Sequence, residues 1–188
     1  MQSLIVITAV ICQLMASISA LQVLVALSKE RLKLASLVAE NKAQMCKAVE
    51  DPDREKEILQ VIVKTAKDQY GLDAHFVEPF FKAQMEANKL LQYGILMEAN
   101  KKNKRPDPII NLNQVRVKVD ELNHEILKNL KDVQKEMAEG KCIEAVNTAL
   151  EKELTQTQDF LYKAALIRAM SSLVDICQEK QKVAQGKA

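Results

Sequence analysis

The sequence predicts an all-α protein, and three observations support that prediction. The chain has 188 residues with only 4 Gly, 4 Pro and 4% aromatic residues, so turn-forming residues are scarce. Hydrophobic residues make up 48% of the chain and charged residues 28%, as in globular proteins. Apolar residues recur at helical spacing through long segments rich in Ala, Leu, Glu, Lys and Gln. We therefore expect six helices, arranged as one helical trio followed by a second.

The charge and the motif content exclude several classes of function. A net charge of +2 argues against a nucleic-acid-binding protein that depends on a large basic surface. The sequence contains no glycine-rich phosphate loop and no CxxC or HxxxH pair. Its two histidines, His75 and His124, lie far apart on different predicted helices, so neither a metal site nor a Ser-His-Asp arrangement is indicated.

The first 20 residues have the pattern of a signal peptide. They contain no charged side chain, and an apolar run over 4–15 is followed by small residues up to Ala20. The alternative is a membrane anchor, because the apolar pattern continues through residues 21–27. Cleavage near Ala20 is favoured because the segment before the small residues is short for a membrane span. We therefore expect a secreted protein, extracellular or periplasmic, with no membrane attachment after cleavage.

Residues 21–188 are expected to form one helical domain. A charged stretch with two prolines lies within 101–110 and reads as a linker between a first half, 21–100, and a second half, 111–178. The expected helices cover 22–49, 53–69, 73–100, 113–138, 142–152 and a last one that begins at a capping box over 155–158 and frays after 178.

The cysteine count fits an oxidising compartment. Cleavage removes Cys12 and leaves Cys46, Cys142 and Cys177, which allow one disulfide and one free thiol. Cys142 and Cys177 flank the last pair of predicted helices, which favours a bridge between them. Cys46 is then the free thiol, and a buried structural role is the simplest expectation for it.

Several polar residues share helical faces with apolar ones. Arg31 and Lys42 are eleven residues apart, about three turns, and so point the same way on one helix. A pair of solvated surface cations is the simpler reading of these two residues alone. Arg54, in the first turn of its helix, opposes the helix dipole, which suggests a ligand carboxylate or, alternatively, a pair with a neighbouring acid. Asn88 and Gln92 are four residues apart and share a face.

Together these residues resemble a known family. Arg31, Lys42 and the run DPDRE over 51–55 have the joint spacing of the active-site run of the all-helical chorismate mutases, the AroQ class. Residues 72–76 open the third helix as in that family, and Asn88 and Gln92 fall at its site positions. The similarity covers residues 23–100 and resumes at Arg116. It implies a six-helix chorismate mutase-like bundle whose first trio carries the site.

The resemblance also implies a reaction, the rearrangement of chorismate to prephenate. This is a unimolecular sigmatropic step that needs no nucleophile, metal or cofactor, so catalysis consists of holding the folded conformer and stabilising charge on the ether oxygen. By resemblance, three arginines bind the carboxylates, two donors bind the ether oxygen, two acids accept from the ring hydroxyl and one amide contacts a carboxylate. The carboxylate-binding arginines are Arg31, Arg54 and Arg116, and the donors to the ether oxygen are Lys42 and Gln92. The acids that accept from the hydroxyl are Asp51 and Glu55, and the amide is Asn88.

Finer expectations follow from the secreted gamma subclass, found in bacterial periplasms and plant-parasitic nematodes. That subclass has a disulfide in the region of Cys142 and Cys177, takes the residue matching Arg116 from the same chain and tends to form homodimers. Such an enzyme fits a role in diverting a host's chorismate. Lys89 is a departure, because secreted relatives often have Glu there. The alternative function is a catalytically inactive secreted helical interaction protein on the same scaffold.

Overall fold

The computed structural model describes residues 18–101, 111–138 and 141–186. Within these ranges the regular structure is entirely helical, which confirms the predicted all-α class. No helix in them combines the length and the apolar content needed to cross a membrane. The predicted signal peptide and linker lie almost wholly outside the described residues. The helices are α2 (Ala20–Lys33), α3 (Ala35–Gln44), α4 (Pro52–Thr65), the π-helix η1 (Ala66–Tyr70), α5 (Ala74–Lys101), α6 (Leu112–Glu136), α7 (Cys142–Leu154) and α8 (Phe160–Ala184).

The first predicted helix is shorter than expected and is divided. It breaks at Leu34, whose N–H bonds to the carbonyl of Arg31 at 3.3 Å, and it ends at Gln44 instead of residue 49. Cys46 has φ +51, and the N–H groups of Cys46 and Lys47 bond back to Ala43 and Lys42. This is the hydrogen-bond pattern of a Schellman motif, which terminates a helix. Residues 45–51, called the 45–51 segment below, are therefore an irregular connection to α4.

Other helix ends follow the predicted signals, with one exception. Asp51 caps α4, and Gly71, with φ +64, ends the π-helix that continues it. The last helix does not begin at the predicted box over 155–158. Asp159 is its N-cap, accepting from the N–H of Tyr162, and the helix continues to Ala184, so the predicted fraying after 178 is wrong.

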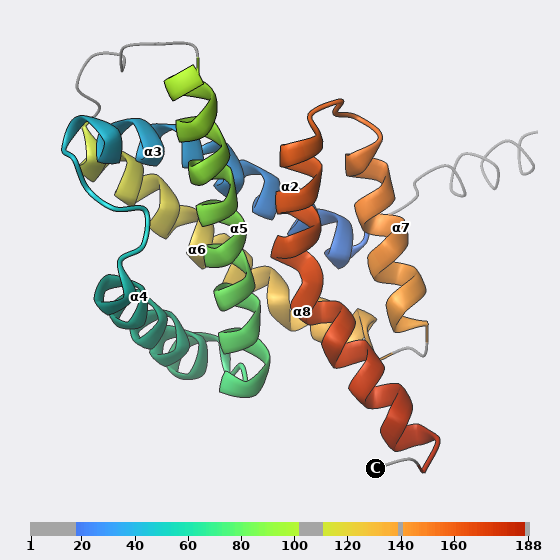
Figure 1. The fold of residues 1–188 in the computed structure, drawn as a ribbon. Helices are drawn as coiled ribbons and strands as arrows, with labels where there is room; N and C mark the ends of the chain where they lie inside the picture. The colour runs from blue at the N-terminus through green and yellow to red at the C-terminus, as the bar shows by residue number, and fades with distance from the viewer. Residues whose placement is uncertain (1–17, 102–110, 139–140, 187–188) are drawn as a thin grey trace, which may run out of the picture.

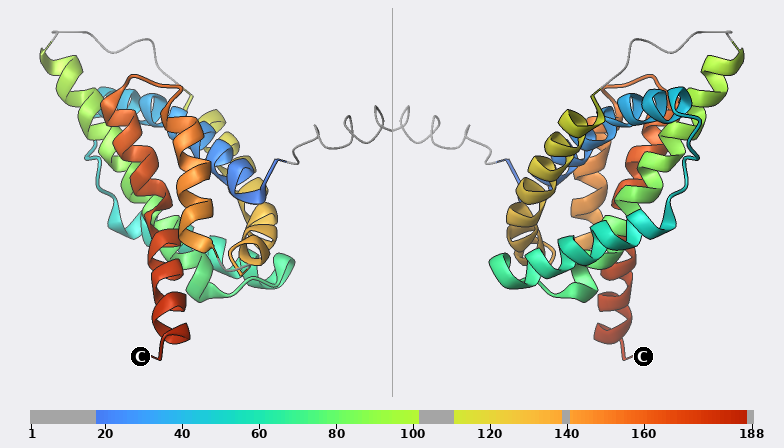
Figure 2. Two further views of the ribbon diagram at one scale, coloured as in Figure 1. Left: turned by 90° about the vertical axis from the view of Figure 1, so that its right-hand side faces the viewer. Right: turned by 90° about the vertical axis from the view of Figure 1, so that its left-hand side faces the viewer.

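The two halves of the chain share one core. α5 from the first half packs along α8 from the second, the largest helix contact among the described residues, and α2 packs on α6 and α7 (Figure 1). The approach of α5 to α8 is close at Gly94, where a Cβ would lie 2.1 Å from Leu161 Cδ2. α4 lies apart from the α7–α8 pair (Figure 1), and the last turns of α8 extend beyond the other helices (Figure 2).

The centre of the core combines aromatic packing with one buried polar bridge. Phe80 and Phe81 are fully buried, and their rings pack edge to face with centroids 5.5 Å apart. Gln84, also fully buried, donates to Ser28 Oγ at 2.9 Å and to the carbonyl of Ala169 at 3.1 Å. Because a buried amide must be paired, these bonds fix α5 relative to both α2 and α8.

A disulfide joins Cys142, the first residue of α7, to Cys177 on α8. This is the pairing that the sequence favours. Cys46 is a free thiol and is exposed, contrary to the buried role expected for it, because it occupies the Schellman turn at the end of α3.

Replacing Cys142 and Cys177 together by Ala is expected to lower the free energy of unfolding by about 2–4 kcal/mol, because the bridge restricts the unfolded chain. The bridged residues are 35 apart in sequence. Urea denaturation measures the loss, and reduction of the wild-type protein should reproduce it. Cys46→Ser is the matched control and should leave the midpoint unchanged. A double variant with the wild-type midpoint would contradict the stabilising role.

Candidate active site

A pocket of about 220 Å³ lies where five helices meet. Side chains from α2, α3, α4, α5 and α6 line it, together with the 45–51 segment. The structure brings all eight predicted site residues to this pocket, called the site pocket below, and their roles toward a substrate stay predictions. They are Arg31, Lys42, Asp51, Arg54, Glu55, Asn88, Gln92 and Arg116.

Arg31 is the most deeply buried cation of the site pocket, with 6% of the residue exposed. Its Nε donates to Asn123 Oδ1 at 3.1 Å, and its Nη1 donates to the carbonyl of Gln84 at 3.3 Å. Burial lowers the pKa of Arg31 to about 10, partly opposed by the Asp120 carboxylate. The guanidinium is still charged at neutral pH, and its orientation is fixed by α5 and α6.

Lys42 is held by the 45–51 segment. Its Nζ donates to the carbonyl of Val49 at 2.5 Å. Burial lowers the pKa of Lys42, and the carboxylates of Asp51, Glu55 and Glu50 oppose that effect. An ammonium has three N–H donors, so the bond to Val49 leaves two for the pocket.

Asn88 and Gln92 form the polar wall that α5 contributes. Gln92 Nε2 donates to Asn88 Oδ1 at 2.6 Å. Gln92 is buried, with 4% exposed, and its Oε1 has no hydrogen-bond partner within the described residues. A buried amide with unused hydrogen-bonding capacity beside a cavity is typical of a site that is completed by a polar ligand or water.

The start of α4 contributes one cation and two carboxylates. Asp51 caps the helix, and its Oδ1 lies 3.3 Å from the N–H of Arg54. Arg54 is exposed and pairs with Glu57 at 3.0 Å. From the sequence, either a ligand carboxylate or a neighbouring acid could be the partner of Arg54, and the structure shows the neighbouring acid. Glu55 points toward α5, where its Oε2 lies 3.1 Å from Lys89 Nζ.

Arg116 completes the ring of cations from α6. It is exposed, and its only described partner is Asn113 Oδ1 at 3.5 Å, one turn earlier on the same helix. Because α6 belongs to the same chain as α2–α5, a single chain supplies all eight predicted residues.

Two residues of this site were not assigned a role from the sequence. Asn123 accepts a hydrogen bond from Arg31. The sequence feature that could have identified Asn123 is its position four residues after Val119, which places a polar residue on the apolar face of α6. Lys89 lines the site pocket and is bonded to three carboxylates. The sequence flagged Lys89 as a departure from secreted relatives but gave no indication of its partners.

The charge of the site pocket suits a small anion. Five cationic side chains line it against three carboxylates, a surplus of two positive charges. Guanidinium groups bind carboxylates through paired N–H donors, so three arginines around a small cavity favour a ligand with more than one carboxylate. Within the described residues, no group of three or more His, Cys, Asp or Glu side chains could hold a metal ion.

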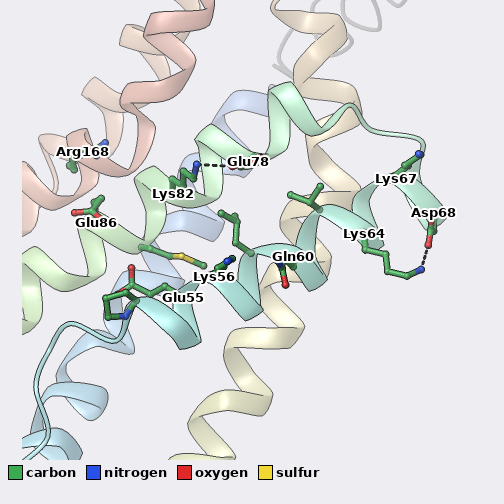
Figure 3. Close-up of a pocket in the computed structure, with 14 residues that line it drawn as sticks. Glu55, Lys56, Gln60, Lys64, Lys67, Asp68, Glu78, Lys82, Glu86 and Arg168 are labelled. Carbon is green, nitrogen blue, oxygen red and sulfur yellow. Dashed lines mark hydrogen bonds and ion pairs between the residues drawn. The ribbon is translucent and has the colours of Figure 1, made fainter.

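A second, wider cavity of about 1070 Å³ lies along another face of α4 and is lined by residues of α4, η1, α5 and α8 (Figure 3). Five cations and four carboxylates line it, a surplus of only one positive charge, and two of the cations are paired, as Lys64–Asp68 and Lys82–Glu78. Glu55 lines both cavities. The wider cavity therefore lacks the concentrated positive charge of the site pocket.

Fold and pocket together define an all-helical protein with a binding site for a small polyvalent anion. Residues 18–93 match the family described as chorismate mutase type II. The chain is 40% identical over 76 residues to the chorismate mutase of Methanocaldococcus jannaschii, covering 40% of this chain and 76% of that protein. The chain therefore belongs to the chorismate mutase type II family, which confirms the AroQ resemblance.

Two further comparisons extend the similarity. Over 98 residues the chain is 32% identical to the monofunctional chorismate mutase of Enterobacter agglomerans, covering 52% of this chain and 54% of that enzyme. The match thus spans about half the length of that relative. The crystal structure of chorismate mutase from Burkholderia thailandensis has a TM-score of 0.75 and 29% identity, covering 82% of this chain and 98% of that one. The shared fold therefore includes helices from both halves of the chain.

Proposed function

We propose that the protein is an isomerase, a chorismate mutase that converts chorismate to prephenate. The observation that carries this proposal is the surplus of two positive charges in a small pocket that also holds a lysine and an amide donor. Chorismate is a dianion, so its two carboxylates match that surplus. Membership of the chorismate mutase type II family supports the same reaction.

The proposed binding mode assigns the arginines to the substrate carboxylates. Two of the five N–H groups of Arg31 are bonded to Asn123 and Gln84, which leaves three without a partner in the described part of the chain. Arg54 and Arg116 lie at the exposed rim of the site pocket, so both can turn toward a ligand. Asn88 lies beside Gln92 and adds a contact to a carboxylate.

Catalysis is proposed to come from donors at the ether oxygen. As the C–O bond breaks, negative charge builds on that oxygen, and donors fixed in advance stabilise it without reorganisation. Lys42 has two N–H donors left for this role, and the Gln92 amide has a second N–H beyond the one bonded to Asn88. Glu55 and Asp51 accept from the ring hydroxyl, so the folded substrate is held at both ends.

We further propose a secreted enzyme of the gamma subclass, cleaved after Ala20 and acting on a host's chorismate. The surroundings of Leu21 support that cleavage position. Leu21 is fully buried, and its backbone nitrogen donates to Glu136 Oε2 at 3.1 Å. If Leu21 became the first residue, its α-ammonium would meet the same carboxylate and form an ion pair. A homodimer stays a prediction.

Purified protein is expected to convert chorismate to prephenate. The loss of the ultraviolet absorbance of chorismate measures this conversion. Arg54→Ala should lower kcat/KM by roughly 100- to 1000-fold, because it removes one of the cations proposed to bind the substrate carboxylates. Arg168→Ala, an exposed arginine on α8 outside the site pocket, is the matched control and should retain wild-type activity. A folded wild-type protein without turnover would instead indicate the inactive interaction protein.

The pH profile of kcat/KM tests the two donors. Gln92 donates at every pH, so we expect no loss between about pH 5 and 7. Lys42 donates only as an ammonium, and because its pKa is lowered, activity should fall with rising pH at a value below 10.5. Gln92→Glu should be active only at acidic pH, where the carboxyl is protonated. A steep wild-type fall between about pH 5 and 7 would remove Gln92 from this role.

Expression in a secreting host tests the proposed processing. Intact-mass analysis of the exported protein should give a chain that begins at Leu21, with the mass also reduced by two hydrogens for one disulfide. A full-length chain retained in the membrane fraction would contradict cleavage and support the anchor alternative.

A further inference from the structure

Lys89 lies at the centre of a cluster of three carboxylates beside the site pocket. Its Nζ lies 2.9 Å from Glu50 Oε2, 3.1 Å from Glu55 Oε2 and 2.8 Å from Glu86 Oε1, and only 12% of its side chain is exposed. Burial works against the charged form, but the three carboxylates outweigh it and raise the pKa of Lys89. The ammonium has three N–H donors, so these bonds leave none for a substrate.

The partners of Lys89 belong to three different parts of the chain. Glu86 precedes it by three residues on α5, an ordinary neighbour on one helix. Glu55 lies in the first turn of α4, and Glu50 lies in the 45–51 segment. A lysine that needed only a surface ion pair would be satisfied by Glu86. The two long-range bonds instead attach α4 and the 45–51 segment to α5.

The 45–51 segment is held from both sides. Tyr93, one turn after Lys89, donates its hydroxyl to Glu50 Oε1 at 3.2 Å, so both oxygens of Glu50 are bonded to α5. On the other side Lys42 donates to the carbonyl of Val49, the residue before Glu50. A displacement of Glu50 therefore moves the carbonyl that orients Lys42.

We infer that Lys89 is a positioning residue for the proposed reaction: its bonds to Glu55 and Glu50 fix the carboxylate that accepts the ring hydroxyl and the carbonyl that orients Lys42. This inference rests on the proposed function. Because Lys89 bonds one oxygen of Glu55, the other oxygen is left for the substrate. Without Lys89, the charges of Glu50, Glu55 and Glu86 repel one another, and Glu55 turns away from the pocket.

Lys89→Met tests this inference, because methionine keeps the length and apolar stem of lysine without its charge. We expect kcat to fall roughly 10- to 100-fold, since a misplaced reacting group has a cost of that order, while KM changes little because the arginines remain. Lys89→Arg should restore most of kcat. The matched control is Lys82→Met on the same helix, whose lysine pairs with Glu78 at 2.6 Å outside the site pocket.

Two further measurements separate positioning from simple stabilisation. In a Glu55→Gln background, Lys89→Met should cost less activity than it does in the wild-type background, because part of its effect passes through Glu55. Amide hydrogen exchange over residues 45–51 should be faster in Lys89→Met and in Glu50→Gln, and unchanged in Lys82→Met. Glu50 is half exposed, so its variant is expected to fold.

The outcomes distinguish this inference from the proposed function. Wild-type kcat with unchanged exchange in Lys89→Met would overturn the inference, as would a lower melting temperature with unaltered kcat. If the wild-type protein does not turn over chorismate, the proposed function fails. Hydrogen exchange alone then tests whether Lys89 attaches the 45–51 segment to α5. Faster exchange over 45–51 in Lys89→Met would then still support the attachment of the segment, whereas equal exchange would overturn it.

Discussion

The buried guanidinium of Arg31 is the interaction on which both the core and the site depend. A charged group can leave water only where protein acceptors replace it. Arg31 obtains these from Asn123 on α6 and from the backbone of Gln84 on α5. The side chain of Gln84 in turn bonds to Ser28 and to the backbone of α8. The polar network that fixes the helices relative to one another is therefore the network that aims the first cation of the pocket.

The pocket residues were predicted from the resemblance to the chorismate mutase family, and helical geometry alone predicted only that Arg31 and Lys42 share a face of one helix. Residues at helical spacing share a face whether or not the rest of the fold is known. Arg31 and Lys42 reach the same pocket although a break at Leu34 separates their helices. Leu34 keeps a right-handed helical conformation, with φ −76° and ψ −10°, so the chain continues in nearly the same direction. The predicted spacing survived the break for that reason.

The features that the sequence did not predict depend on tertiary contacts or on residues that are unusual at the ends of helices. Cys46 occupies a left-handed position that glycine usually fills, so nothing in the sequence marked the end of α3. Asp159 caps α8 because it accepts from Tyr162, although a capping box four residues earlier offered an alternative. Lys89 meets Glu50 across 39 residues, a contact that no periodicity reveals. Helix faces were predictable, and the connections between helices were not.

Among the cations of the site pocket, Arg31 and Lys42 differ from Arg54 in the kind of acceptor to which they bond, and the difference has a physical consequence. Arg31 and Lys42 bond to neutral acceptors, an amide and two backbone carbonyls, which hold an orientation without cancelling the charge. Arg54 instead pairs with Glu57 at the surface, where an ion pair contributes little, so exchanging that carboxylate for one of a ligand costs little free energy. The two inner cations, Arg31 and Lys42, are therefore held in fixed orientations, whereas Arg54 at the rim is held only by a surface ion pair.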